Sequence, residues 1–340
     1  KGEIDRDVIN HYHEIIDDLI TNNIKPVITL HHFTEPIWFH DMGAFEKEEN
    51  IDIFVSYSKL IFSEFSSKVK IWCTINEPSV YSTHGYFTGI FPPGKKNAGT
   101  AVKVLKNLLN LHVEIYLALK AMPNGSECRI GIVKNINQFE PYRRHSIMDW
   151  MVSLINNQFF NNSVINFFKK GVFKIRIPGL AWIKYRNNKA IGSMDFFGLN
   201  YYSHNHVKFK LNPKEFFELK FLKQDTMTDM PYTIYAEGFY RALHQASILN
   251  KPIIVTENGI ADLKDANRAK YIEQYLYALS KALEDGLDIK GYYYWSLLDN
   301  FEWAFGYDMK FGLYEVDFKT QKRTLREGAK VYKKIVQENS

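Results

Sequence analysis

Residues 252–259 read Pro252-Ile253-Ile254-Val255-Thr256-Glu257-Asn258-Gly259. The β-branched residues of this stretch suit a strand that is buried on both faces, and a polar turn ending in glycine follows at once. Glu257 is therefore predicted to stand at the carboxyl end of a strand.

A second glutamate occupies an equivalent position earlier in the chain. Residues 69–75 read Val-Lys-Ile-Trp-Cys-Thr-Ile and lead directly into Asn76-Glu77-Pro78. In parallel barrels the catalytic groups come from the ends of several different strands, and cleavage of a glycosidic bond uses a pair of carboxyl groups. One glutamate at a strand end is more often a solvated rim residue, but two in these contexts indicate paired acid chemistry.

Strand-like and helical patterns alternate along the chain. Six strand-like runs lie near residues 24–30, 69–75, 129–133, 194–199, 252–256 and 289–295, with helical periodicity between them. Helices are expected at about 51–65 and 149–166, among others, and a long connection at about 203–231. Such alternation is typical of a parallel sheet, and a (β/α)₈ barrel needs eight strands. We therefore expect an α/β fold, a TIM barrel with six of its eight strands identifiable, in which residues 1–340 form a single domain.

The chain opens with a predicted helix that no strand precedes. Apolar residues recur at three- and four-residue steps from Val8 to Ile20, and Asp5 is placed to cap the helix. The expected barrel thus lacks its first two βα units, and we expect these units to belong to a longer protein or to be supplied by a complement. A long loop rich in Gly, Pro and aromatic residues, from Tyr81 to Gly99, is expected to shape a pocket.

Composition narrows the classes of partner. The chain has 43 Lys and Arg residues and 38 Asp and Glu residues, so its formal net charge is only +5. These charges are spread along the chain. We expect no nucleic-acid partner, and we interpret the basic runs at 169–176 and 208–223 as solvated faces or loop edges. No apolar run reaches the ~18 residues of a membrane span, so none is expected.

Cysteine and histidine usage argues against metals and disulfides. The two cysteines, Cys73 and Cys128, have no metal-ligand spacing, and their scarcity favours a reducing compartment, so a cytoplasmic location is expected. The side chains of the adjacent His31 and His32 would point in different directions. A zinc-binding helix motif needs two histidines four residues apart, and Asp17 occupies the position of the second. The sequence therefore predicts no metal and no cofactor.

Several motifs together resemble glycoside hydrolase family 1, the β-glucosidase and β-galactosidase family. In the family's order they span residues 29–33 (Thr-Leu-His-His-Phe), 74–78 (Thr-Ile-Asn-Glu-Pro), 200–202 (Asn-Tyr-Tyr), 255–259 (Val-Thr-Glu-Asn-Gly) and 295–303 (Trp-Ser-Leu-Leu-Asp-Asn-Phe-Glu-Trp). Each motif is modest alone, but the set covers nearly the whole chain. The resemblance implies a TIM barrel that hydrolyses β-glycosides or oligosaccharides.

The resemblance also assigns roles. It implies that Glu77 is the general acid/base and that Glu257 is the nucleophile of a retaining mechanism, which removes terminal β-D-glucosyl, galactosyl or fucosyl residues through a covalent glycosyl-enzyme. Asn76 would bind the sugar 2-hydroxyl, and Tyr202 would hydrogen-bond the nucleophile. The remaining residues implied for the sugar site are His32, Asn200, Trp295, Glu302 and Trp303.

Two departures from the family pattern keep an alternative open. Phe33 stands where many members have tryptophan. The family's first strand supplies a glutamine to the sugar site and its second strand an arginine beside the nucleophile, and neither strand is recognisable here. A carbohydrate-binding protein that has lost catalysis is the competing interpretation, although such a protein would have no chemical need of Glu77 and Glu257.

Overall fold

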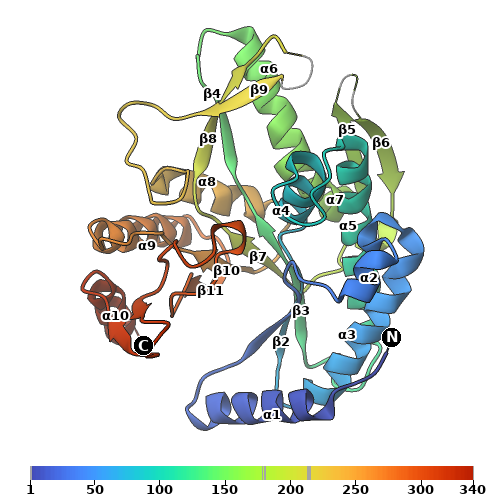
Figure 1. The fold of residues 1–340 in the computed structure, drawn as a ribbon. Coiled ribbons are helices and arrows are strands. Elements are labelled where there is room, and N and C mark those ends of the chain that lie inside the picture. Colours follow the sequence, from blue (N-terminus) through green and yellow to red (C-terminus); the bar gives the residue numbers. More distant parts are fainter. Residues whose placement is uncertain (1, 178, 180, 213–215, 340) are drawn as a thin grey trace. The chain divides into compact units, whose positions relative to one another are not determined.

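The computed structural model describes residues 2–177, 179, 181–212 and 216–339. By its contacts the chain divides into two compact units. Unit 1 comprises residues 1–134 and 166–198, and unit 2 comprises residues 135–165 and 199–340. Figure 1 labels the helices and strands of both units.

The six predicted strands are all present, and their order in the sheet, β1-β2-β3-β7-β10-β11, follows the chain. Their bounds are β1 (Val27–His31), β2 (Ile71–Asn76), β3 (Arg129–Asn135), β7 (Phe196–Asn200), β10 (Ile253–Asn258) and β11 (Ile289–Tyr294). The pairs β1–β2, β2–β3 and β10–β11 are parallel. The alternation of strand and helix in the sequence therefore predicted this sheet correctly.

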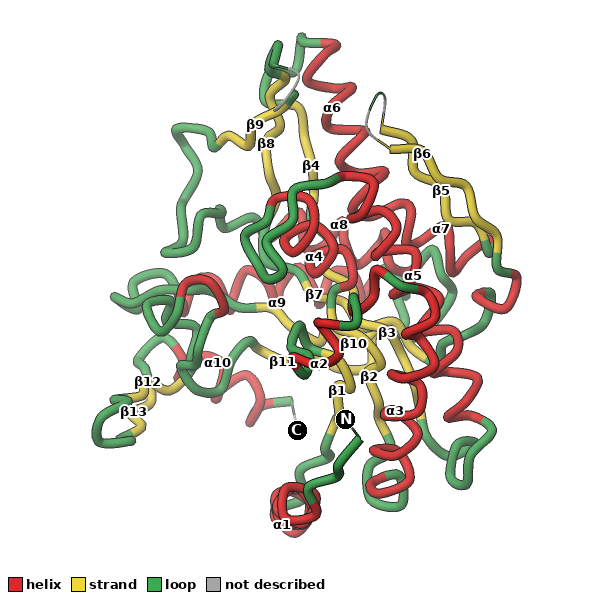
Figure 2. Tube along the Cα trace, turned by 45° about the vertical axis from the view of Figure 1, so that its right-hand side comes forward, coloured by secondary structure: helices red, strands yellow, loops and turns green. Residues whose placement is uncertain are grey.

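Unit 1 builds its core between β2, β3 and two long helices. Helix α3 (Ile51–Phe65) packs beside α5 (Ala98–Lys120), as Figures 1 and 2 show. The Phe62 ring of α3 lies 4.9 Å from that of Trp72 on β2, both fully buried. Asn97 caps α5 by accepting a hydrogen bond from the N–H of Thr100. These contacts fix β2, the strand that directly precedes Glu77.

The opening helix has the predicted limits. Helix α1 spans Arg6–Thr21, and Asp5 caps it by accepting hydrogen bonds from the N–H groups of Asp7 and Val8. Of its apolar stripe only Ile9 and Ile16 are buried. The other helices of unit 1 are α2 (Ile37–Asp41), α4 (Pro78–Ser82) and α7 (Ser163–Lys170), the last of which begins in unit 2.

The stretch that follows Glu77 is more ordered than the predicted loop. It forms α4 and then η3 (Thr83–Thr88), one turn of π-helix, before the Pro-rich turn. The predicted helix near residues 149–166 is likewise divided into α6 (Ile147–Asn157), η4 (Gln158–Asn162) and α7. The 3₁₀ segments are η1 (Ala44–Glu46), η2 (Glu48–Asn50), η5 (Asn188–Ala190) and η6 (Trp303–Phe305).

The basic run at 169–176 lies partly on a hairpin that the sequence analysis did not anticipate. Strands β5 (Val172–Ile177) and β6 (Ala181–Arg186) pair antiparallel. Phe173 and Ile175 are buried, whereas Lys174 and Arg176 are exposed. The basic side chains thus form a solvated face, as expected, but on a strand.

Unit 2 contains a second sheet where a long connection was expected. Strand β8 (His204–Phe209) pairs in parallel with β4 (Gln138–Pro141) and antiparallel with β9 (Phe217–Lys220). The interpretation of residues 203–231 as connection only was therefore wrong for this part. Buried Asp149 of α6 ties the helix to this sheet, because its carboxylate accepts from the Arg143 guanidinium and from the N–H of Phe209. Figure 1 shows α6 beside these strands.

The remaining helices of unit 2 are α8 (Ala236–Ser247), α9 (Arg268–Glu284) and α10 (Ala329–Glu338), and a small hairpin is formed by β12 (Tyr314–Val316) and β13 (Arg323–Leu325). Helices α8 and α9 pack together around aromatic rings. The Tyr271 and Tyr275 rings stack at 3.8 Å, and Phe239 lies 5.7 Å from Tyr275. Among the described residues no helix combines the length and apolar character of a membrane span.

Candidate active site

Glu77 occupies the sharp turn between β2 and α4. Its side chain is 6% exposed, and its backbone adopts the left-handed region with φ +46°. Its N–H donates to the carbonyl of Val133 on β3 at 2.9 Å, and Pro78 begins the helix without needing a hydrogen-bond partner for its nitrogen. Non-glycine residues held in this backbone region cluster at functional sites. The turn fixes the direction of the Glu77 carboxyl.

Asn76 and His32 lie beside this turn. The Asn76 amide donates from Nδ2 to His32 Nε2 at 3.0 Å. Burial, with a smaller contribution from His31, lowers the pKa of His32 to about 4. His32 is therefore neutral at physiological pH, and because Nε2 accepts from Asn76, its proton sits on Nδ1 as a donor.

Lys134 is a site residue that the sequence analysis missed. Its side chain is fully buried at the end of β3, next in the chain to the Val133 carbonyl that binds Glu77. Burial lowers the pKa of Lys134 to about 7, and the charge of Glu77 partly offsets that effect. The sequence did contain a signal for this residue, because the lysine directly follows the apolar strand residues 130–133.

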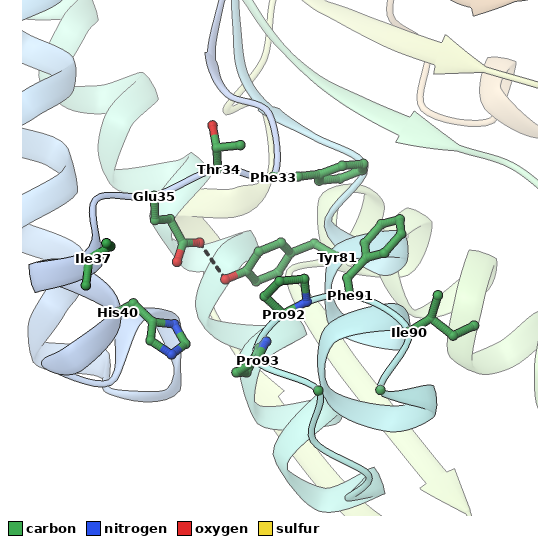
Figure 3. A pocket seen from close by; sticks show the side chains of 12 residues that line it. Phe33, Thr34, Glu35, Ile37, His40, Tyr81, Ile90, Phe91, Pro92 and Pro93 are labelled. Atoms are coloured by element: carbon green, nitrogen blue, oxygen red, sulfur yellow. Dashed lines mark hydrogen bonds between the residues drawn. The ribbon is translucent and has the colours of Figure 1, made fainter. Parts of the chain in front are cut away.

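A pocket of about 670 Å³ lies in unit 1 between the segment after β1 and the turn after η3. Figure 3 shows Phe33, Phe91 and the two prolines Pro92 and Pro93 along it. At its edge the Tyr81 hydroxyl donates to Glu35 Oε1 at 2.5 Å. The predicted loop therefore does line a pocket, together with Phe33.

Glu35 is joined to β1 through a second contact. Its Oε1 lies 3.2 Å from Nε2 of His31, which is fully buried between aromatic rings. Tyr81 is also the residue whose N–H donates to the Glu77 carbonyl at 3.0 Å. Glu35, absent from the predicted site, thus connects the pocket to the turn of Glu77.

Glu257 lies at the end of β10 in unit 2, with a side chain that is 9% exposed. The Tyr202 hydroxyl donates to Glu257 Oε2 at 2.6 Å, the contact that the family resemblance implies. The Tyr201 N–H donates to the Glu257 carbonyl at 3.0 Å. The segment after β7 thus holds both the backbone and the carboxylate of Glu257.

Asn258 explains why an amide follows Glu257. Its Nδ2 donates to the Tyr201 carbonyl at 2.6 Å and to the Tyr271 hydroxyl at 2.9 Å, and its Oδ1 accepts from the Tyr292 hydroxyl at 2.8 Å. The side chain is fully buried. Three directed hydrogen bonds of one amide therefore fix the strand end.

Gly259 is required by a close backbone approach. A Cβ built on it would lie 1.8 Å from the carbonyl oxygen of Trp295, which no side chain can tolerate. The Trp295 N–H donates to the Asn258 carbonyl at 3.0 Å. The glycine therefore lets the end of β11, with the half-buried Trp295, lie directly against the segment after Glu257.

Asn200, Glu302 and Trp303 complete the predicted residues of unit 2. The Thr256 hydroxyl donates to Asn200 Oδ1 at 2.6 Å, which orients the amide. Glu302 is half-buried, and its N–H donates to the Gly306 carbonyl at 2.6 Å. Trp303 opens η6 with φ +46°. A short turn of 3₁₀-helix therefore presents the Glu-Trp pair.

Arg268, which the sequence analysis did not identify, holds three segments of unit 2 together. Its guanidinium is fully buried at the start of α9. It donates to the carbonyls of Ile260, Asp262, Lys310 and Phe311, to the Tyr294 hydroxyl and to Asp265 Oδ1. The segment after β10, the end of β11 and the segment that follows η6 thus share one anchor.

The structure places Glu77, Asn76 and His32 together in unit 1, and Glu257, Tyr202, Asn200 and Trp295 in neighbouring segments of unit 2. The pairing of Glu77 with Glu257 stays a prediction. These residues lie in the last positions of strands or soon after them, which is where the sequence predicted them.

Comparison with known proteins identifies the family. The model of glycosyl hydrolase family 1 matches residues 1–340. The chain belongs to this family. A 1,4-beta-D-glucan glucohydrolase of Thermotoga neapolitana is 31% identical over 99% of the chain and 79% of its own length. Beta-glucosidase A of Acetivibrio thermocellus is 30% identical over 99% of the chain and 80% of its own length.

Solved structures of family members agree with this assignment. A beta-glycosidase from Pyrococcus horikoshii matches with a TM-score of 0.90 and 37% identity, over 99% of the chain and 77% of its own length. A beta-glucosidase from Thermotoga maritima in complex with castanospermine matches with a TM-score of 0.87 and 30% identity, over 100% of the chain and 80% of its own length. This family member is a glycoside hydrolase of the TIM-barrel class, as predicted.

Proposed function

We propose that this glycoside hydrolase is a retaining β-glycosidase that removes terminal β-D-glucosyl or β-D-galactosyl residues, with Glu257 as nucleophile and Glu77 as acid/base. The observation that carries the assignment of roles is the 2.6 Å hydrogen bond from Tyr202 to Glu257 Oε2. A donated hydrogen bond stabilises the ionised carboxylate. Glu257 is thereby prepared to attack, and Glu77 is left as the residue that donates the proton.

The reaction proceeds in two displacements. In the first, a Glu257 oxygen bonds to the anomeric carbon while the Glu77 proton passes to the glycosidic oxygen, and the aglycone leaves as an alcohol. In the second, Glu77 takes a proton from water, the water oxygen bonds to the anomeric carbon, and the ester to Glu257 breaks. This mechanism requires the two carboxyls to be about 5–5.5 Å apart.

The neighbouring side chains suit a neutral sugar. Neutral His32 offers its Nδ1 proton to a hydroxyl, Asn76 is assigned to the 2-hydroxyl, and Trp295 offers an aromatic face to the C–H groups of the ring. The carboxylate of Glu302 would repel a phosphate at the sugar 6-position. One relative is named a 6-phospho-beta-galactosidase. We propose that this chain instead takes sugars with a free 6-hydroxyl.

Azide rescue tests the two roles. Glu257→Gly should abolish turnover of a p-nitrophenyl β-glucoside, and azide should restore it by giving the inverted α-glycosyl azide. For Glu77→Ala, azide should attack the accumulated glycosyl-enzyme and give the retained β-azide, because an activated aryl group can leave without acid assistance. Glu284→Gly, an exposed position on α9, is the matched control and should need no azide.

The opposite stereochemistry in the two variants would reverse the assignment. Absence of turnover by the unsubstituted chain would instead favour the carbohydrate-binding alternative. That alternative gains no support from the described residues, since the Tyr202–Glu257 bond has no purpose in sugar binding alone.

A further inference from the structure

Three metal-ligating side chains meet in unit 2 on the second sheet. Glu140 lies on β4, and His204 and His206 lie on β8. The two strands pair in parallel with Glu140 opposite His206. Residues two apart on a strand share a face, so both imidazoles and the carboxylate project to the same side. One donor atom from each of the three lies within 4.8 Å of the others.

The spacing of the two imidazoles matches that of ligands on one ion. Nε2 of His204 lies 3.1 Å from Nε2 of His206. A tetrahedral zinc ion with Zn–N bonds of about 2.0–2.1 Å holds two nitrogens about 3.3 Å apart. The rings therefore need to move by only a few tenths of an ångström to share an ion.

His204 presents Nε2 to this cluster. Its other nitrogen, Nδ1, lies 3.2 Å from the Thr233 hydroxyl oxygen. Metal-bound histidines commonly donate this second N–H to an oxygen, which directs the opposite lone pair at the ion. Thr233 is itself held, because the Ser203 hydroxyl donates to its carbonyl at 2.6 Å.

His206 and Glu140 supply the second line of evidence. His206 is 8% exposed, and its Nδ1 is buried without a hydrogen-bond partner among the described residues. Its facing nitrogen has only His204 as partner. No hydrogen bond at Nδ1 among the described residues therefore competes with metal binding through Nε2, the nitrogen that faces His204. Glu140 is oriented by Arg241, which donates to Oε1 at 2.6 Å and leaves the second oxygen for a ligand role.

We propose that Glu140, His204 and His206 bind one divalent transition-metal ion, zinc in the first place, with a water as fourth ligand. Two imidazoles and one carboxylate suit zinc, cobalt or nickel better than magnesium or calcium. The ion would fasten β8 to β4 directly after Tyr202. This inference does not depend on the proposed glycosidase mechanism.

Metal titration of the chelator-treated and dialysed 340-residue chain tests the site. Calorimetry with Zn²⁺ should give one ion per chain, and Co²⁺ should give the visible absorption of a four-coordinate ion. His206→Asn and Glu140→Gln should each weaken Zn²⁺ binding by at least ~100-fold, more than the ~10–100-fold typical of losing an outer partner.

His244→Asn is the matched control. This histidine also pairs with a carboxylate in unit 2, since its Nε2 lies 3.0 Å from Asp285 Oδ2, but among the described residues it belongs to no group of three possible metal ligands. Its replacement should leave stoichiometry and affinity unchanged. If the circular dichroism of His206→Asn shows that this variant does not fold, the test of the metal site rests on Glu140→Gln and on the Co²⁺ spectrum of the unsubstituted chain.

Three results would overturn the proposal. The first is an unsubstituted chain that binds neither ion, in which case the His204–His206 contact is an ordinary hydrogen bond. The second is Zn²⁺ affinity that survives both His206→Asn and Glu140→Gln. The third is binding that disappears in His244→Asn, which would place the ion on α8.

Discussion

The contact between Tyr202 and Glu257 leads to a prediction at the scale of single residues. Tyr202→Phe removes a hydrogen bond to a carboxylate, a loss of roughly 1.5–3 kcal/mol or about 10–150-fold in kcat/KM. Because the hydroxyl favours the ionised carboxylate, the acid limb of the kcat/KM profile should also move to higher pH. A p-nitrophenyl β-glucoside assay across pH measures both effects. Tyr277→Phe, on the exposed face of α9, is the control, and an unshifted acid limb would contradict the role of Tyr202.

Lys134 leads to a second prediction at this scale, which concerns the alkaline limb of the pH profile of kcat/KM. Lys134→Met removes a positive charge beside Glu77, so the protonated acid should persist to higher pH. An opposite charge within about 4–6 Å shifts a carboxyl by ~1–3 pKa units, and a partly neutral lysine should give the low end of that range. The alkaline limb of kcat/KM should therefore move up by roughly one pH unit. Lys103→Met, on the exposed face of α5, should leave it in place.

The same substitution has a stability signature. The folded pKa of Lys134, about 7, lies below the usual lysine value, so the unfolded chain binds more protons between these two values. The unfolding free energy of the unsubstituted chain, relative to that of Lys134→Met, should therefore rise with pH above about 7. Urea unfolding at several pH values measures this difference, and a flat or falling difference would argue against a neutral buried lysine.

At the residue scale the sequence located the groups that follow strand ends and missed those defined by burial. Glu77 and Glu257 were visible because a buried strand followed by a polar turn marks its own terminus. Lys134 and Arg268 are charged residues inside the fold. The apolar run before Lys134 was a local signal, but nothing in the sequence distinguishes Arg268 from a solvated arginine. Their partners come from segments that only the folded chain brings together.

At the scale of elements, Arg268 couples three segments of unit 2. Arg268→Met leaves several carbonyls and Asp265 without their donor, and breaking such a buried cluster costs about 3–5 kcal/mol. Urea unfolding should show this loss. KM for the glucoside should rise as well, because Arg268 holds the segment that follows Glu302 and Trp303. Arg323→Met, on the exposed β13, is the control, and an unchanged midpoint would show that the anchor is not needed.

Element prediction succeeded where apolar residues recur clearly and failed where a strand is very short or polar. The helix Ile51–Phe65 and the six strands followed directly from apolar spacing. Strands β4 and β9 have four residues each, and β8 opens with His204, Asn205 and His206, so none of the three contains an apolar run. The same omission hid the proposed metal site. His204 and His206 show strand spacing, but Glu140 is their neighbour only through the β4–β8 pairing.

At the scale of the whole molecule, the path of the chain bears on the single domain that the sequence predicts. The chain passes from one unit to the other at residues 134–135, 165–166 and 198–199. Each passage falls inside an element, namely β3, α7 and β7, and none falls in a linker. A strand or helix cannot remain formed in one half while its other half unfolds without losing its own hydrogen bonds. Independent unfolding of the units would therefore break three elements at once.

We predict from this path a single cooperative unfolding transition. The two cysteines provide a local probe, because Cys73 and Cys128 are both buried free thiols of unit 1. Pulsed thiol labelling along a urea series reports the unfolding of unit 1, whereas far-ultraviolet circular dichroism reports all helices and strands. Coincident midpoints are expected. Labelling that precedes the circular-dichroism change would mean that unit 1 unfolds first, and labelling that lags behind it would mean that unit 2 does. Either separation would contradict a single domain, and calorimetric and van't Hoff enthalpies that disagree would do so independently.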